Sequence, residues 1–227
     1  MLTKIEDEMK KLLFFALCTL QSCYLLAQIP YFAGTPNKDK LYSYTSLKVR
    51  PGENMQETYT TFQYGIGSGF ASGLDLYTGI GAAYMGALLR YGLKIDKYFN
   101  IGGQVTPSFD LNNSMKFSYV TAALYMNGAI TKDNRLFWCG NTWWGINKDI
   151  ANTISQYAYL GYLFTIKNGD AITPMLGTIY SWKFDQDADV ALGFYYTHKR
   201  WNFYLWGNDY LKKNPCLLYT SPSPRDT

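Results

Sequence analysis

The sequence predicts an all-β protein, an up-and-down antiparallel transmembrane β-barrel of about 10–12 strands. Across residues 40–211, apolar and polar residues alternate with a period of two, which is typical of strands. Short groups of Asn, Asp, Gly and Lys interrupt this alternation, as expected for hairpin turns. No helical pattern of about 10–15 residues separates the segments, and this excludes a βαβ fold.

The clearest predicted strand lies at residues 99–111, where odd positions such as Ile101 and Val105 are apolar. Its even positions, among them Gln104 and Thr106, are polar or Gly. The same pattern predicts further strands within residues 40–49, 87–95, 119–126, 154–166, 190–196 and 201–205.

Two features complicate this series of strands. Pro107 and Pro174 lie inside predicted strands, and because proline lacks an amide N–H we expect both at bulges or strand ends. Residues 65–86 are rich in Gly and Ala. They leave two arrangements open, namely two strands with a tight bend or one strand followed by a loop folded inward.

The first 27 residues have the pattern of a secretory signal peptide, with Met9 as the expected start. Lys10 and Lys11 precede an apolar stretch at residues 12–20, which is too short to span a bilayer. Cleavage is expected after Ala27, and a lipobox-like alternative would instead make Cys23 the lipidated first residue. The barrel domain is therefore expected at residues 28–215.

Residues 216–227 differ in composition from the rest of the chain. The letters CLLYTSPSPRD match the translation of a transposase-type sequencing adapter. We therefore expect this tail to be adapter read-through, and the barrel domain to be incomplete at its C-terminus.

Composition excludes several classes of protein. Aromatic residues make up 18% of the chain and charged residues 17%, the latter against roughly a quarter in an ordinary soluble domain. This composition excludes a disordered chain. A single His excludes a multi-histidine metal site, and a dispersed net charge of +4 does not favour nucleic acid as the partner. No cofactor is expected.

Strand length and aromatic content favour a barrel in a membrane. A tilted strand of about ten residues covers the apolar band of an outer membrane, and Tyr and Trp suit the headgroup level at its edges. The candidates for such interfacial aromatics lie near segment ends: Tyr91, Tyr98, Tyr119, Trp143, Trp144, Tyr157, Trp182, Tyr195, Trp201 and Tyr210.

The signal peptide, the Tyr- and Phe-rich alternation and the short polar turns resemble Gram-negative outer-membrane β-barrel proteins. Residues 88–103 also look like a strand–turn–strand element of outer-membrane transporters of the phenol-degradation type. The resemblance implies a porin-like pore, transporter or structural protein in the bacterial outer membrane. It also implies the lipid bilayer, the barrel-assembly machinery and small solutes as partners.

Five basic residues are candidates for charges in the lumen: Arg90, Lys94, Lys116, Lys167 and Lys183. In the lumen they would favour anionic solutes, whereas at the rim they would lie near lipid headgroups. No catalytic site is expected. The one imidazole, His198, would need a facing Ser to act in a hydrolase, and a solvated turn residue is the simpler interpretation.

A soluble exported barrel of the lipocalin type, which would bind an apolar or aromatic ligand inside, is the alternative. Alternation alone does not distinguish the inner face from the outer face. The two hypotheses differ in which face is apolar, because a membrane barrel is apolar outside and a soluble barrel is apolar inside.

Overall fold

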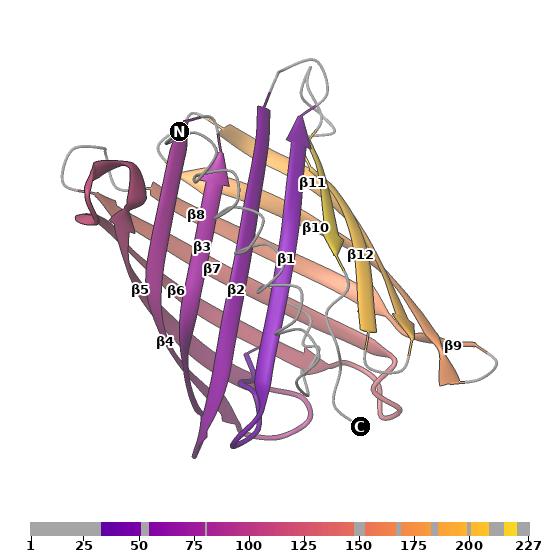
Figure 1. Cartoon of the computed structure of the whole chain (residues 1–227). Helices are drawn as coiled ribbons and strands as arrows, with labels where there is room; N and C mark the ends of the chain where they lie inside the picture. The colour runs from indigo at the N-terminus through magenta and orange to yellow at the C-terminus, as the bar shows by residue number, and fades with distance from the viewer. Residues whose placement is uncertain are drawn as a thin grey trace.

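The computed structural model describes residues 33–50, 55–79, 81–147, 153–166, 169–182, 186–198, 201–208 and 216–221. These residues form a β-barrel with inclined strands (Figure 1). Its first strands are β1 (Leu41–Arg50), β2 (Met55–Gly67), β3 (Phe70–Gly79), β4 (Ala82–Lys94), β5 (Asn100–Asp110), β6 (Lys116–Ala129) and β7 (Leu136–Asn147). A short 3-10 turn, η1 (Leu111–Asn113), precedes β6, and the remaining strands are β8 (Thr153–Tyr162), β9 (Phe164–Thr165), β10 (Ala171–Trp182), β11 (Gln186–His198), β12 (Trp201–Asn208) and β13 (Cys216–Ser221).

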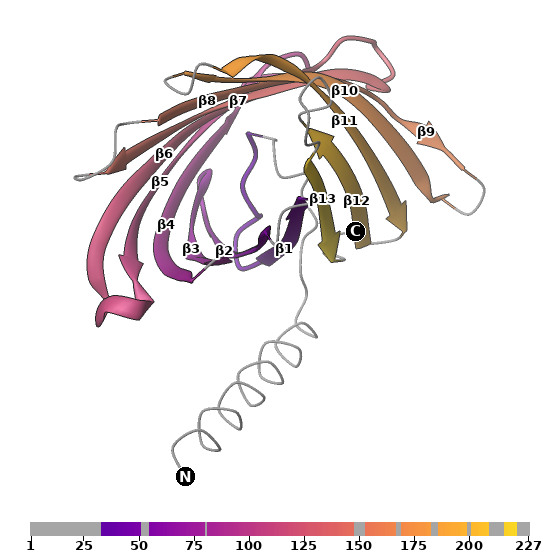
Figure 2. The same ribbon diagram turned by 90° about the horizontal axis from the view of Figure 1, so that it is seen from above.

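Every strand pairing is antiparallel, and neighbours in the sheet are neighbours in the chain apart from β8 with β10 and the closing pair of β13 with β1. The strand β13 pairs with both β12 and β1, which closes the sheet on itself (Figure 2). The two-residue strand β9 pairs with β10 beyond the end of β8, so twelve of the thirteen strands form the closed ring. The predicted up-and-down barrel is therefore confirmed. Among the described residues, no helix is long and apolar enough to cross a bilayer.

The strand β5 shows how the alternation produces the two surfaces. Gln104, Thr106 and Ser108 are buried on the inner face, whereas Val105 between them is exposed on the outer face. Because successive side chains of a strand point to opposite faces, this one register places every polar residue of the segment inside.

The two prolines lie at irregularities, as expected. Pro107 pairs with Val120, and the pairing of β5 with β6 shifts directly afterwards, between Ser108 and Phe109. Pro174 lies on β10 where its neighbour changes from β8 to β9, so it occupies a break in the ladder. The glycine-rich residues 65–86 form two strands with tight bends, since β3 lies between the end of β2 and the start of β4.

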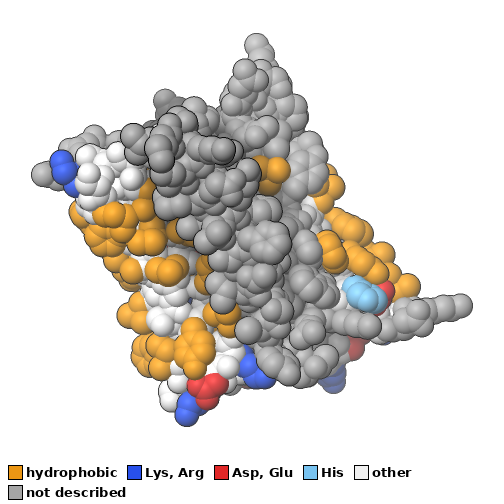
Figure 3. All heavy atoms as spheres, in the orientation of Figure 1, with side chains coloured by type: hydrophobic (Ala, Val, Ile, Leu, Met, Phe, Trp, Pro, Cys, Tyr) orange, Lys and Arg blue, Asp and Glu red, His pale blue; other side chains and the backbone are white. Residues whose placement is uncertain are grey.

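The described outer surface is apolar. Figure 3 shows hydrophobic side chains over much of the described surface, with the visible charged side chains near its two ends. Exposed apolar residues of the strands include Leu47, Ile66, Leu74, Leu89, Val105, Ile146, Leu160, Leu176, Leu192, Phe194, Phe203 and Leu205. This is the arrangement expected of a membrane barrel, and it is the reverse of a soluble lipocalin-like barrel.

Several predictions fall on residues outside this description. The signal peptide, with its cleavage point after Ala27 and the alternative at Cys23, lies outside the described residues. The backbone of β13 is described, and its register runs from Val49 opposite Leu217 to Thr45 opposite Ser221. Its assignment to adapter read-through stays a prediction.

Candidate functional site

The interior of the barrel is divided into a packed part and a part with cavities. On the side of β1, β8 and β10–β12, aromatic side chains fill the space. Trp206 packs against Tyr159 with ring centroids 4.6 Å apart, and its indole N–H donates to the hydroxyl of Tyr195 at 3.0 Å. Tyr44 stacks on Tyr204 at 5.6 Å. The remaining space is lined mainly by β2–β7, with Tyr42 and Tyr44 of β1 and Tyr157 of β8 at its border with the packed part.

Two cavities follow each other along the barrel axis. The first chamber, of about 170 Å³, is lined by Tyr42, Tyr44, Tyr59, Thr61, Gln63, Arg90, Gln104, Tyr125, Trp143 and Tyr157. The second chamber, of about 120 Å³, is lined by Tyr59, Asp75, Tyr77, Tyr84, Gly86, Thr106, Ser108, Tyr119, Thr121 and Trp143. Tyr59 and Trp143 line both chambers, so these two rings form the constriction between them.

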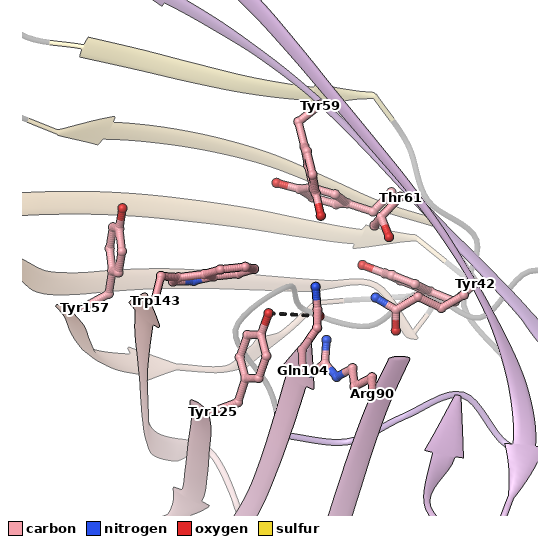
Figure 4. Close-up of a pocket in the computed structure, with 10 residues that line it drawn as sticks. Tyr42, Tyr59, Thr61, Arg90, Gln104, Tyr125, Trp143 and Tyr157 are labelled. Atoms are coloured by element: carbon pink, nitrogen blue, oxygen red, sulfur yellow. Dashed lines mark hydrogen bonds between the residues drawn. The ribbon is translucent and has the colours of Figure 1, made fainter. Parts of the chain in front are cut away.

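The first chamber collects side chains from opposite walls of the barrel. Figure 4 shows Tyr42 and Tyr59, from β1 and β2, pointing toward Trp143 and Tyr125 on the far wall. Tyr125 meets Trp143 edge to face, with ring centroids 5.6 Å apart. The guanidinium carbon of Arg90 lies 4.2 Å from the centre of the Tyr125 ring, in a cation–π contact.

A chain of hydrogen bonds connects the two chambers. The Tyr125 hydroxyl donates to Gln104 Oε1 at 3.2 Å, and Gln104 Nε2 donates to Thr106 Oγ1 at 3.1 Å. The Thr106 hydroxyl in turn donates to Asp75 Oδ2 at 3.4 Å. This orientation of the Gln104 amide follows from the network, because each donor then meets an acceptor. These hydrogen bonds hold in place the side chains that line one wall of the lumen.

Charges inside the described part of the barrel nearly cancel. Arg90, only 4% exposed, is the buried cation, and Asp75 and Asp189 are the buried acids. Lys48 and Glu57, which share the inner faces of β1 and β2, form an ion pair of 3.2 Å. The described lumen therefore has no excess of positive charge.

Residues 33–40, which we call the strap, lie inside the barrel ahead of β1 (Figure 2). The backbone N–H of Ala33 donates to Asn127 Oδ1 at 2.8 Å, and the hydroxyl of Thr35 donates to the carbonyl of Gly69 at 3.2 Å. At its other end the N–H of Asp39 donates to the carbonyl of Gly65 at 2.9 Å. The strap thus narrows the lumen at the end of the barrel where β1 begins.

Small residues of the wall make room for the strap. A Cβ atom added at Gly92 or Gly102 would overlap the carbonyl oxygen of Ala33, and one at Gly65 would overlap that of Asn37. Glycine at positions 92 and 102 is therefore needed for close contact with another part of the chain.

Of the five basic residues predicted as lumen charges, the structure describes three, and these lie in different places. Arg90 points into the first chamber. Lys94, the last residue of β4, pairs with Asn100 at the start of β5. Lys116, the first residue of β6, pairs with Asp110 at the end of β5. The two lysines are exposed and therefore lie at opposite rims of the barrel. Lys167 and Lys183 lie outside the described residues.

The prediction of interfacial aromatics was wrong for four residues. Tyr119, Trp143 and Tyr157 line the chambers, and Tyr195, 1% exposed, belongs to the packed aromatic cluster. Proximity to a segment end does not decide which face a residue occupies, since the register does.

The other interfacial candidates lie elsewhere. Tyr91 and Tyr98 are exposed, and Tyr91 packs against Phe70 on the neighbouring strand, with centroids 4.6 Å apart. Trp144 shares the outward face of β7 with the exposed Ile146. The side chains of Trp182 and Trp201, and the whole of Tyr210, lie outside the description.

His198 lies at the end of β11, on the outward-facing side of the strand. Its Nδ1 is 2.9 Å from Asp170 Oδ1, and the hydroxyl of Tyr196 donates to Asp170 Oδ2 at 2.6 Å. No Ser is among the contacts described for this cluster. Within the described residues, no group of three or more His, Cys, Asp or Glu is placed to hold a metal ion.

Most residues of the two chambers were not singled out from the sequence. Tyr59, Gln63, Gln104 and Asp75 lie on the polar side of alternating segments, and this alternation is the one available clue. It assigns them to a face, but it does not show which strands lie opposite each other across the lumen.

No protein-family model and no curated protein matches the sequence. The structure is similar to that of the KdgM porin, with a TM-score of 0.62 and 12% identity over 82% of this chain and 99% of the porin. It also resembles KdgM solved in complex with disordered oligogalacturonate (TM-score 0.60, 10% identity, 82% and 99% covered). A third similar structure is the NanC porin (TM-score 0.56, 11% identity, 82% and 100% covered). At this level of identity the likeness concerns the backbone, and the chain has the fold of a porin-type antiparallel β-barrel.

Proposed function

We propose that this chain is an integral outer-membrane β-barrel that acts as a narrow, passive pore for small polar solutes. The apolar outer surface around a polar, hollow lumen carries this proposal, because such a surface is stable in lipid and unfavourable in water. The porin-type fold supports the same localisation. As partners we infer the lipid bilayer and the barrel-assembly machinery.

The lumen favours solutes without net charge. The KdgM structure is described with an acidic oligosaccharide, oligogalacturonate. In the described lumen of this chain, Arg90 is accompanied by the buried acids Asp75 and Asp189, and Lys48 is paired with Glu57. Because these residues carry no excess of positive charge, the pore lacks the electrostatic basis for strong anion selection.

The proposal does not include catalysis. His198 contacts Asp170 on the outward side of the barrel, away from both chambers. Substitution His198→Gln should leave solute permeation unchanged.

Planar-bilayer recordings with the purified, folded protein test the pore directly. We expect small, ohmic conductance steps in KCl, and a higher conductance for Trp143→Ala because this change removes one side of the constriction. Trp144→Ala, next to it on the outward face, is the matched control and should conduct like the parent. Protein that fractionates as soluble, or that shows no conductance in any form, would contradict the proposal.

A further inference from the structure

We infer that the first chamber is a binding subsite for one uncharged, polyhydroxylated six-membered ring, that is, a neutral pyranose. The inference deepens the proposed pore function and rests on it for its biological meaning. Its basis is the combination of ring-lined walls, buried amide and hydroxyl groups, and the limited volume of the chamber.

The size of the chamber favours a single ring. Its volume is about 170 Å³, little more than the ~150 Å³ of a cavity that holds one benzene ring, so it has no room for two sugar rings. Because Tyr59 and Trp143 separate it from the second chamber, a longer chain could occupy both only by threading between these rings.

The walls fit the two kinds of surface that a pyranose presents. Six of the ten lining residues are aromatic: Tyr42, Tyr44, Tyr59, Tyr125, Trp143 and Tyr157. The faces of such rings carry partial negative charge and attract the partially positive C–H groups of a sugar ring. When the C–H face of a pyranose lies flat on an aromatic side chain, the hydroxyl groups around the edge of the sugar point away from that side chain. They can then form hydrogen bonds with polar side chains.

Those polar side chains are present at the chamber. Gln63 is only 3% exposed, lines the chamber, and its Oε1 has no hydrogen-bond partner among the described residues. A buried acceptor of this kind is unfavourable unless a ligand or water donates to it. Thr61, two residues before Gln63 on β2, and Gln104 on β5 also line the chamber and carry a hydroxyl and an amide.

The charge of the chamber favours a neutral sugar over an acidic one. Arg90 lies against the face of Tyr125, where the ring satisfies part of its positive charge. The nearby carboxylate of Asp75 is linked to the same wall through Thr106 and Gln104. A carboxylate ligand would gain from Arg90 but lose through repulsion by Asp75.

Calorimetric titration of the full chain in detergent micelles tests the subsite with three probes. Methyl β-D-glucopyranoside should bind, and sorbitol, which has the hydroxyls but no closed ring, should bind at least about tenfold more weakly. Glucuronate, the acidic counterpart, should bind no more tightly than the glucoside. Equal binding of sorbitol, or clearly tighter binding of glucuronate, would overturn the inference.

Variants identify the residues responsible. Trp143→Ala should weaken glucoside binding about tenfold, and Gln63→Leu about fivefold. Trp143→Phe keeps an aromatic ring and should retain most of the glucoside binding. It is the control for the case in which the alanine variant does not fold. Trp144→Ala should bind like the parent. Unchanged binding in both Trp143→Ala and Gln63→Leu would refute the subsite.

Conductance recorded from the same preparation keeps the two proposals apart. A conducting protein that binds no glucoside refutes the subsite and leaves the pore intact. Binding without conductance refutes the pore and leaves the subsite intact.

Discussion

The backbone N–H of Ala33 donates a hydrogen bond of 2.8 Å to the side-chain oxygen of Asn127, a residue 94 positions later in the chain. Both residues are buried, and Ala33 packs beside Ala123 and Tyr125 on the inner wall. This one contact attaches the strap (residues 33–40) to β6. The strap therefore depends on a side chain of the barrel wall as well as on its own backbone.

Removing the acceptor should release the strap. In Asn127→Leu, the N–H of Ala33 keeps no partner at this position, and we expect a loss of about 1–3 kcal/mol in local stability. Hydrogen exchange of residues 33–40 should become faster, and pore conductance should rise. Asn112→Ala, which removes a hydrogen bond to Gly81 at the opposite end of the barrel, is the control and should change neither measurement.

Adjacent glycines of β5 offer a matched pair of substitutions. A Cβ at Gly102 would overlap the carbonyl oxygen of Ala33, whereas a Cβ at Gly103 would meet only Ala123 O, at 3.7 Å. Gly102→Ala should therefore displace the strap and raise its hydrogen exchange, while Gly103→Ala should not. Equal exchange in the two variants would show that the strap does not lie against this part of the wall.

Ion selectivity should respond to the charges of the two chambers. Arg90→Met keeps the apolar stem but removes the cation beside Tyr125, so the lumen becomes more negative and cation permeation should increase. Asp75→Asn should shift selectivity the other way. At about 1 kcal/mol for an ion passing within ~4 Å, each change corresponds to roughly a fivefold change in the permeability ratio. Reversal potentials in a KCl gradient measure it, and shifts of the same sign would contradict the assignment.

The alternation of residues 99–111 was sufficient to predict β5 and its polar inner face, because the strand period fixes side-chain direction locally. It did not predict that Tyr59 and Trp143 both line the two chambers, since that depends on the curvature and closure of the whole sheet. Nor did it show that the strap explains Gly92 and Gly102, because such contacts join residues far apart in the chain.

The positions of the aromatic residues show a second limit of prediction from the sequence. Tyr and Trp are favourable both at a lipid interface and in a packed interior, so composition did not separate the two. The interior uses many of them, as Tyr195 and Trp206 illustrate. The expectation that residues 216–227 are adapter read-through depends on the letters alone and stays a prediction.

Substitutions on the outer surface can show whether lipid or water surrounds the middle of the barrel. Leu176 lies near the middle of β10 and is 57% exposed, and Ile95 lies in the turn after β4 and is 56% exposed. In a bilayer, Leu176→Arg should cost about 2–4 kcal/mol, because it places a charge near the midplane, while Ile95→Arg near the rim should cost only about 0–1 kcal/mol. Unfolding by guanidinium in lipid vesicles, followed by gel mobility, measures both. Since the two positions are equally exposed, equal costs would show that no apolar phase surrounds the middle of the barrel.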